Sequence, residues 1–167
     1  MTLRAAKLLL VAAVALYHTL VVLNNTTEYA SNQQFVRHVM SMDSTFPENH
    51  AMWRAVDSPV MHKAFYVGII AWEAATMLLC WWGAVELARA LRGRAAVFEA
   101  AKRSAIAGLT LSMLMWLLAF LGIGGEWFLM WQSKTWNGQE AAFRMFTVAG
   151  IVLLVLIQRE AGESSQV

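Results

Sequence analysis

Residues 64–88 constrain this chain more than any other stretch. They read AFYVGIIAWEAATMLLCWWGAVELA and place Glu73 well inside an apolar run. At ~1.5 Å per residue, a helix of this length crosses a hydrocarbon layer of ~30 Å with some tilt. Ser58 and Pro59 precede it as a helix-start signal, a hydroxyl cap followed by proline in the first turn. A carboxyl at this depth is costly unless it is protonated, paired or in contact with water. Other parts of the chain must therefore provide a partner for Glu73.

Three more apolar runs occur in the 167 residues, of which 59% are hydrophobic and 14% charged. This composition is typical of a membrane protein rather than of a soluble domain. The apolar run near the N-terminus extends past the ~7–15 residues of a signal-peptide core, so we interpret it as a retained span. The sequence thus predicts an all-α fold, a single four-span membrane bundle over residues 1–160. The predicted spans and the polar tail are at about 5–23, 64–88, 104–124 and 141–157, and at 161–167.

The polar segment at 24–63 contains two predicted amphipathic helices. Apolar residues recur at helical spacing behind Ser31 and Gln34, which form a capping-box pattern. A second helix is expected from Pro47 to about Val56. Helices with one apolar face would fold over the end of the bundle or lie in the membrane interface.

The basic residues predict the orientation. Eight of the thirteen fall on the side of the N-terminus, namely Arg4, Lys7, Arg89, Arg92, Arg94, Lys102, Arg103 and Arg159. Positive charge beside membrane spans marks the cytoplasmic side. We therefore expect both termini in the cytoplasm, with residues 24–63 and a Trp-rich hairpin at 125–140 outside. The net charge of +2 is too small to indicate nucleic acid binding.

Ionisable or hydrogen-bonding groups are expected in the outer half of the membrane, one from each span. They are His18, Glu73, Glu126 and Arg144. In the inner half we expect only Glu86, near the edge. In one interpretation Glu73 forms an interhelical hydrogen bond, or an ion pair with Arg144, that specifies packing. The alternative is a polar pocket, open to the outside, in which Glu73 binds a small molecule or cation or relays a proton.

Small and aromatic residues predict further contacts. Ser104, Gly108 and Ser112 recur at every fourth position, a pattern that allows a neighbouring helix to approach closely. The glycines at 122–125 indicate the end of a helix. Five tryptophans are expected to form an outer aromatic surface at headgroup level: Trp53, Trp72, Trp127, Trp131 and Trp136.

The sequence predicts no resident cofactor. Its single cysteine, Cys80, excludes an intramolecular disulfide and any Cys-x-x-Cys site. Two alternatives remain. His18 and His62, on adjacent predicted helices, could ligate haem b, although His18 lies deeper in the membrane than His62. Soft and imidazole ligands suited to Cu(I) are also present, namely His38, Met40, Met42 and His62.

Three segments together resemble a known family. They are NNTTEYASNQQFVRHVMSMDSTFP at 24–47, the pair Trp72-Glu73, and GGEWFLMWQSKTWNGQ at 124–139. In these the chain is similar to a family of predicted small integral membrane proteins from bacteria, a domain of unknown function. The resemblance spans nearly the whole chain and implies four spans in a bacterial inner membrane. It implies no activity, cofactor or catalytic residue.

No catalytic triad, phosphate-binding glycine loop or carboxylate pair is present in the sequence. We therefore expect a non-enzymatic accessory subunit that docks a membrane or periplasmic protein through its outer face. The alternative function is a small-molecule or cation binder or transporter centred on Glu73.

Overall fold

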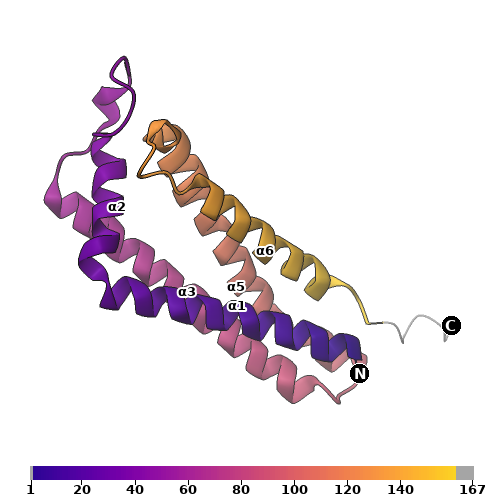
Figure 1. Cartoon of the computed structure of the whole chain (residues 1–167). Coiled ribbons are helices and arrows are strands. Elements are labelled where there is room, and N and C mark those ends of the chain that lie inside the picture. The colour runs from indigo at the N-terminus through magenta and orange to yellow at the C-terminus, as the bar shows by residue number, and fades with distance from the viewer. Residues whose placement is uncertain (1, 161–167) are drawn as a thin grey trace.

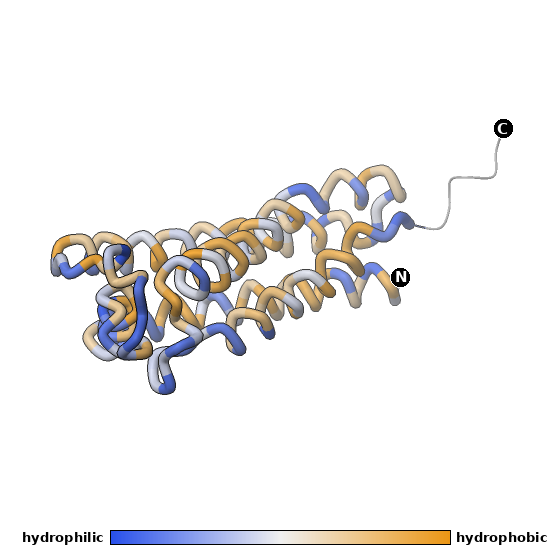
Figure 2. The backbone as a smooth tube through the Cα atoms, turned by 90° about the horizontal axis from the view of Figure 1, so that it is seen from above, coloured by the Kyte–Doolittle hydropathy of each residue, from blue (hydrophilic) through white to orange (hydrophobic). Residues whose placement is uncertain are grey.

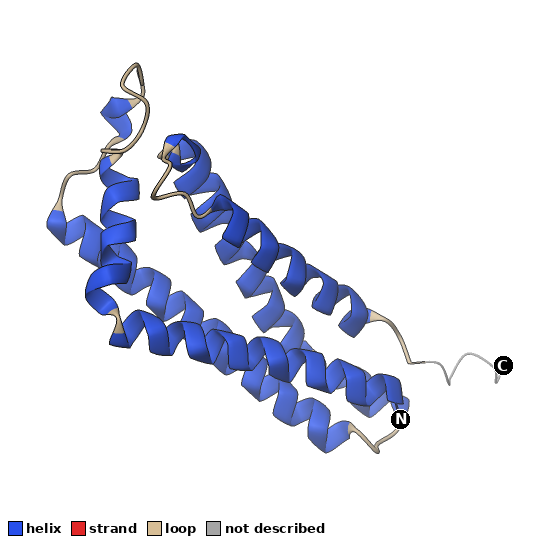
Figure 3. Cartoon of the chain, in the orientation of Figure 1, coloured by secondary structure: helices blue, strands red, loops and turns tan. Residues whose placement is uncertain are grey.

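The computed structural model describes residues 2–160, which are largely helical and contain no strand (Figures 1 and 3). Four helices are long and apolar enough to cross a membrane, and each predicted span lies within one of them: α1 (Thr2–Thr27), α3 (Pro59–Ala90), a composite helix (Ala95–Trp127) and α6 (Gln139–Ile157). The predicted all-α four-helix membrane fold is confirmed. The predicted tail at 161–167 lies outside the described residues.

The spans form two helix pairs. α1 packs along α3, while α6 packs along the composite helix, which comprises α4 (Ala95–Ala100), α5 (Arg103–Leu114) and the π-helix η2 (Met115–Trp127). Contacts between α3 and α5 join the pairs. Both described ends of the chain lie at one end of the bundle, here named the terminal end, and the two pairs separate toward the opposite end (Figure 1). Hydrophilic residues gather at both ends (Figure 2).

The opposite end, here named the loop end, is built from short elements. These are α2 (Tyr29–Ser41), η1 (Met52–Arg54), η3 (Met130–Gln132) and the segments that connect them. α2 packs on α3 and shares an apolar core with residues of α3, η3 and Phe128, which follows η2. A second core lies toward the terminal end, where all four spans contribute buried side chains.

Glycine sets the distance between α3 and α5. A Cβ added at Gly83 would lie 2.4 Å from the backbone nitrogen of Ala105, and one added at Gly108 would lie 2.7 Å from the Sγ of Cys80. The two helices therefore approach so closely that neither position accepts a side chain. Of the predicted small-residue pattern, Gly108 lies at this contact and Ser104 donates to Glu86 of α3 (2.6 Å), whereas Ser112 forms its hydrogen bond with His18 of α1 (2.9 Å).

Two predictions for the loop end are wrong. α2 begins at Tyr29, so Ser31 lies inside the helix, where its hydroxyl donates to the Glu28 carbonyl instead of capping. The expected helix from Pro47 to Val56 shrinks to the three residues of η1. Asn49 explains this, because its side-chain oxygen accepts from the Ala51 amide at 2.7 Å and stabilises a turn.

The prediction of a helix end at Gly122–Gly125 is also wrong. The helix continues to Trp127 as η2, and its end is marked by the i→i+5 bond from the Phe128 amide to the Ile123 carbonyl (3.0 Å). No described glycine has a positive φ, so these glycines do not form a left-handed cap. Gly125 instead permits close approach of Gln139, whose Nε2 would lie 2.4 Å from an added Cβ.

Candidate functional site

A cavity of about 430 Å³ lies at the loop end, between the two helix pairs. Its walls come from α2, α3, η2 and the start of η3. The side chains are all apolar: Phe35, Val36, Val39, Met40, Ala64, Phe65, Ile69, Trp72, Ala119, Phe120, Ile123, Phe128 and Met130, with Gly68 and Gly124 between them. Such a lining can hold an apolar molecule but offers no partner to a charged one.

The exposure of the lining residues shows where the cavity opens. Phe65 of α3 is 42% exposed and Ile123 of η2 is exposed as well, whereas Met40 of α2 is 3% exposed and Met130 is buried. The side formed by α2 and η3 is thus closed. The mouth lies between α3 and η2, which both belong to helices of membrane-spanning length.

Two residues of α3 shape the interior. Gly68 faces open space, because no atom lies within 4 Å of the position that a Cβ would take. Trp72 uses its indole nitrogen to donate to the Leu111 carbonyl at 3.0 Å. The polar atom of the indole is therefore satisfied elsewhere, and the ring contributes apolar surface to the wall.

Hydrogen bonds hold the closed end together. The Ser44 hydroxyl donates to Ser133 at 2.8 Å, and the Phe46 amide donates to the Gln132 side chain at 3.1 Å. Arg54 donates to the carbonyls of Glu126 (3.4 Å) and Trp127 (3.5 Å). Residues 42–58 and 126–133, here named the loop-end cap, thus cover the cavity on the side away from the terminal end.

Glu73 has a partner that the sequence did not predict. Its carboxylate is buried and accepts from the Asn25 side chain of α1 at 2.6 Å, while Tyr66 donates to the Asn25 carbonyl at 2.8 Å. The predicted interhelical hydrogen bond of Glu73 is thus present, whereas the predicted ion pair with Arg144 is wrong, since within residues 2–160 Glu73 forms no salt bridge. The reason is the helix arrangement, in which α3 packs against α1 and α5 while Arg144 is exposed on α6.

The four predicted intramembrane groups do not form one cluster. His18 is fully buried and forms a hydrogen bond with the Ser112 hydroxyl (2.9 Å), not with Glu73. Its other ring nitrogen, Nδ1, has no partner within the described chain. Glu126 is exposed at the end of η2. None of the four lines the apolar cavity, and a polar pocket around Glu73 stays a prediction.

Four of the five predicted tryptophans lie at the loop end. Trp53 is 72% exposed and meets Trp127 edge-on at 5.8 Å, and the Arg54 guanidinium lies 5.2 Å from the centre of each ring. Trp131 is exposed and packs against Phe46. The fourth, Trp136, stacks on His38 at 4.5 Å.

The proposed metal and haem ligands have other partners. His38 pairs with Asp43 at 2.7 Å, and His62 donates to the Val56 carbonyl at 2.6 Å. Met40 and Met42 are buried in the loop-end core. Among residues 2–160, no group of three or more His, Cys, Asp or Glu is placed to hold a metal. That the protein has no resident cofactor stays a prediction.

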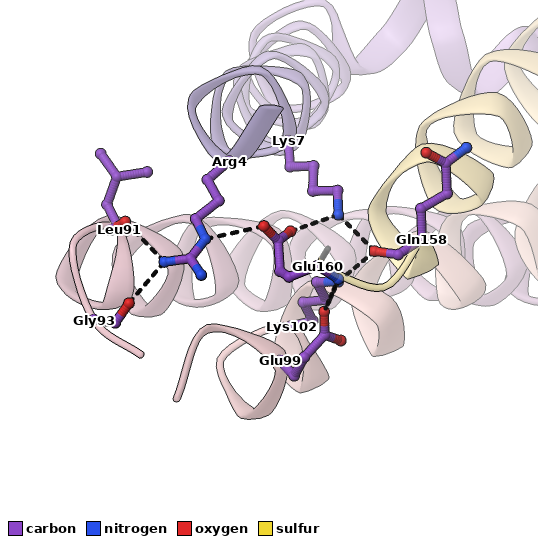
Figure 4. Close-up of polar contacts among 8 residues, drawn as sticks. All are labelled: Arg4, Lys7, Leu91, Gly93, Glu99, Lys102, Gln158 and Glu160. Atoms are coloured by element: carbon purple, nitrogen blue, oxygen red, sulfur yellow. Dashed lines mark hydrogen bonds and ion pairs between the residues drawn. The ribbon is translucent and has the colours of Figure 1, made fainter. Parts of the chain in front are cut away.

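The terminal end contains an ionic cluster that sequence reasoning missed (Figure 4). Glu160 accepts from Lys7 (2.8 Å) and Arg4 (3.0 Å), and the Gln158 carbonyl accepts from both Lys7 (2.6 Å) and Lys102 (2.8 Å). Lys102 also pairs with Glu99 at 2.7 Å. The cluster therefore joins α1, the α4–α5 corner and the segment after α6.

The expectation that only Glu86 occupies the inner half is therefore wrong. Lys7 and Lys102 are 1% and 2% exposed. A signal for Lys7 was available, because it lies on the same helix face as the buried residues Val11, Val14 and His18. The spacing 7, 11, 14, 18 indicates a lysine that points into the bundle. The sequence around Lys102 contains no comparable signal.

The partners of Glu160 also change its acidity. Burial raises the pKa of Glu160. The hydrogen bonds from Lys7 and Arg4 and the charges of both lower it by more, so the pKa lies below its ordinary value. Glu160 is thus held as a carboxylate that pairs with two cations.

Four membrane-length helices around apolar cores define an all-α, multi-pass integral membrane protein. Within that class the chain belongs to the family described as predicted small integral membrane protein (DUF2165), whose model matches residues 3–159. The resemblance noted from the sequence is confirmed. Neither the curated proteins nor the solved structures contain a match to this chain.

Proposed function

We propose that this is a non-enzymatic membrane protein that binds an apolar molecule from the bilayer in its loop-end cavity. The observation that carries the proposal is the cavity itself, with its wholly apolar lining and its mouth between α3 and η2. A mouth between two spanning helices gives access from hydrocarbon rather than from water. Its volume falls in the range of about 300–1,000 Å³ that is usual for small-molecule sites.

The conformation of one wall supports the same proposal. η2 is π-helical over Met115–Trp127 and contributes Ala119, Phe120, Ile123 and Gly124 to the cavity. π-Helical turns are rare and occur frequently at functional sites. A helix that keeps this conformation beside the cavity is consistent with a wall shaped for a ligand.

The test fills the cavity without disturbing its surroundings. A leucine at Gly68 projects into open space, and leucine is the better helix former, so Gly68→Leu should fold normally. Val67→Leu is the matched control, because Val67 neighbours it on α3 and is exposed. The proteins are extracted in mild detergent, and their bound molecules are identified by native mass spectrometry.

We expect the wild type and Val67→Leu to retain an apolar molecule and Gly68→Leu to lose most of it. Equal retention by all three proteins, or no retained molecule in the wild type, would count against the proposal. Thermal unfolding of each variant verifies that the loss does not reflect misfolding.

A second candidate function is an accessory role, in which the loop end docks a membrane or periplasmic protein. Exposed Trp53, Trp127 and Trp131 favour it, because tryptophan and arginine dominate the binding energy of many interfaces. Here Trp53→Ala should remove a stoichiometric partner from a mild-detergent pull-down, whereas Trp82→Ala, on the exposed surface of α3, should not. A wild-type protein that purifies alone would contradict this role.

Location is also part of the proposal. Both described ends lie at the same end of the bundle, and the basic residues concentrate there, which supports cytoplasmic termini in a bacterial inner membrane. Glu48→Cys, in an exposed part of the loop-end cap, should then react with an impermeant thiol reagent added to intact cells, whereas Arg92→Cys should not. The reverse pattern would invert the topology.

A further inference from the structure

The loop-end cap places a cation at the end of η2, the helix that forms one side of the mouth of the cavity. Arg54 donates to the Trp127 carbonyl, and the next residue, Phe128, lines the cavity. Two residues after Arg54, the Val56 amide donates to the carbonyl of Met40, another lining residue, at 2.8 Å. The segment that carries Arg54 is therefore bonded to both walls, through the Arg54 side chain on one and the Val56 amide on the other.

The guanidinium of Arg54 has unused donor capacity. Within residues 2–160 no carboxylate lies within 4.0 Å of it, and its contacts are two long bonds from Nη1 to carbonyls. Its Nε is buried without a partner. Nη2, in contrast, forms no hydrogen bond within the described residues and is not among the buried atoms without a partner, so the outer edge of the guanidinium retains donors that can bind an oxyanion.

The aromatic rings beside Arg54 hold this edge in place. The guanidinium lies 5.2 Å from the ring centres of both Trp53 and Trp127, within the range of cation–π attraction. Trp and Arg at this position are typical of the headgroup level of a membrane. A second cation, the exposed Lys63, immediately precedes Ala64 of the lining.

We infer that the occupant of the cavity is a phospholipid, with an acyl chain between α3 and η2 and its phosphodiester bound by Arg54. This rests on the proposed function and adds the class of ligand. An apolar site and a phosphate-binding cation lie next to each other, and the mouth faces the bilayer. A phospholipid supplies both chemistries in one molecule, whereas free phosphate would leave the cavity empty.

The experiment compares two lipids that differ only in the headgroup. Delipidated full-length protein in detergent is titrated with dioleoyl phosphatidylglycerol and with dioleoylglycerol, and binding is followed by native mass spectrometry. The wild type should prefer the phospholipid roughly tenfold, since charge-assisted hydrogen bonds are the strong ones. Arg54→Gln should abolish this preference and leave dioleoylglycerol binding unchanged.

Two variants sharpen the result. Arg54→Lys keeps the charge without the planar fork and should retain part of the preference. Arg37→Gln removes the same charge from the exposed face of α2, where the arginine contacts only Gln34 among the described residues, and should behave as wild type. An equal loss in Arg37→Gln would overturn the inference, because the effect would then be one of net charge.

The outcomes separate this inference from the proposed function. Equal binding of both lipids by the wild type would overturn the headgroup site while the apolar site stands. Binding of neither lipid would overturn both. The lipid comparison in the wild type needs no variant, so a variant that fails to fold does not prevent the test.

Discussion

Glu160 is the residue on which the terminal end depends most. It satisfies Arg4 and the fully buried Lys7, and its own amide donates to Glu99 at 3.0 Å. Removing one partner of a buried ion pair leaves an uncompensated charge and costs more than the pair itself contributes. These contacts also join α1 to the segment after α6, so a change here acts on both helix pairs.

Glu160→Gln should therefore lower the free energy of unfolding by about 3 kcal/mol, because Lys7 then remains buried without a counter-charge. The measurement is chemical unfolding in detergent micelles. Glu48→Gln, in an exposed part of the loop-end cap, is the control and should change the free energy of unfolding by less than about 0.5 kcal/mol. A small change in the free energy of unfolding for both variants would mean that the ionic cluster contributes little to stability.

The pH dependence follows from the lowered pKa of Glu160. A carboxyl whose pKa is lower in the folded than in the unfolded protein binds more protons when unfolded, so its stabilisation is complete well above the ordinary value of about 4.3. That contribution should decline as the pH falls below this value and through the folded pKa. Unfolding measured from pH 7 to pH 3 should show the decline in the wild type and a flatter profile in Glu160→Gln.

Glu73→Gln distinguishes a packing role from transport. Glutamine keeps an oxygen that can accept from Asn25, so the variant should insert, fold and lose less than about 1 kcal/mol of stability. Transport through Glu73 stays a prediction, and it requires that the same variant abolish a pH-dependent ion or ligand response in proteoliposomes. A wild-type response that Glu73→Gln leaves intact would exclude that role.

At the scale of elements, hydropathy was sufficient to predict the spans, because long apolar runs have few alternatives to a spanning helix. The ends of the spans were harder to predict, since the glycines at 122–125 indicated the end of a helix and instead lie within η2. The site was not predictable in the same way. Gly68 looks like any helix glycine in the sequence, and only the separation of the helix pairs shows that it faces a cavity. The partner of Glu73 was missed because neutral Asn25 carries no charge signal.

Two glycines of α3 give a matched test of this geometry. Gly83→Ala should destabilise the protein by about 2 kcal/mol or more, because the new methyl group meets the Ala105 backbone at 2.4 Å. Gly68→Ala should be neutral or stabilising by up to about 1 kcal/mol, since its methyl group meets nothing and alanine favours helix. The free energies of unfolding of the two variants are measured under the same condition. Similar free energies would contradict the close α3–α5 contact.

At the scale of the whole molecule, the two ends have different properties. The terminal end combines a shared apolar core with buried ion pairs, which holds the four spans together. At the loop end the helix pairs separate around the cavity, and short elements rich in exposed tryptophan cover it. This difference between the two ends supports the proposal that the loop end holds a lipid.

The most direct test of lipid binding uses native membranes. A phospholipid with a photoreactive acyl chain is incorporated into cells that express the protein, cross-linked by light, and mapped by peptide mass spectrometry. The label should concentrate in peptides that contain residues 64–72 and 119–130, and Gly68→Leu should remove it. A label spread evenly over exposed residues elsewhere on the spans, such as Leu78 and Leu154, and unchanged in Gly68→Leu, would contradict a lipid site in the cavity.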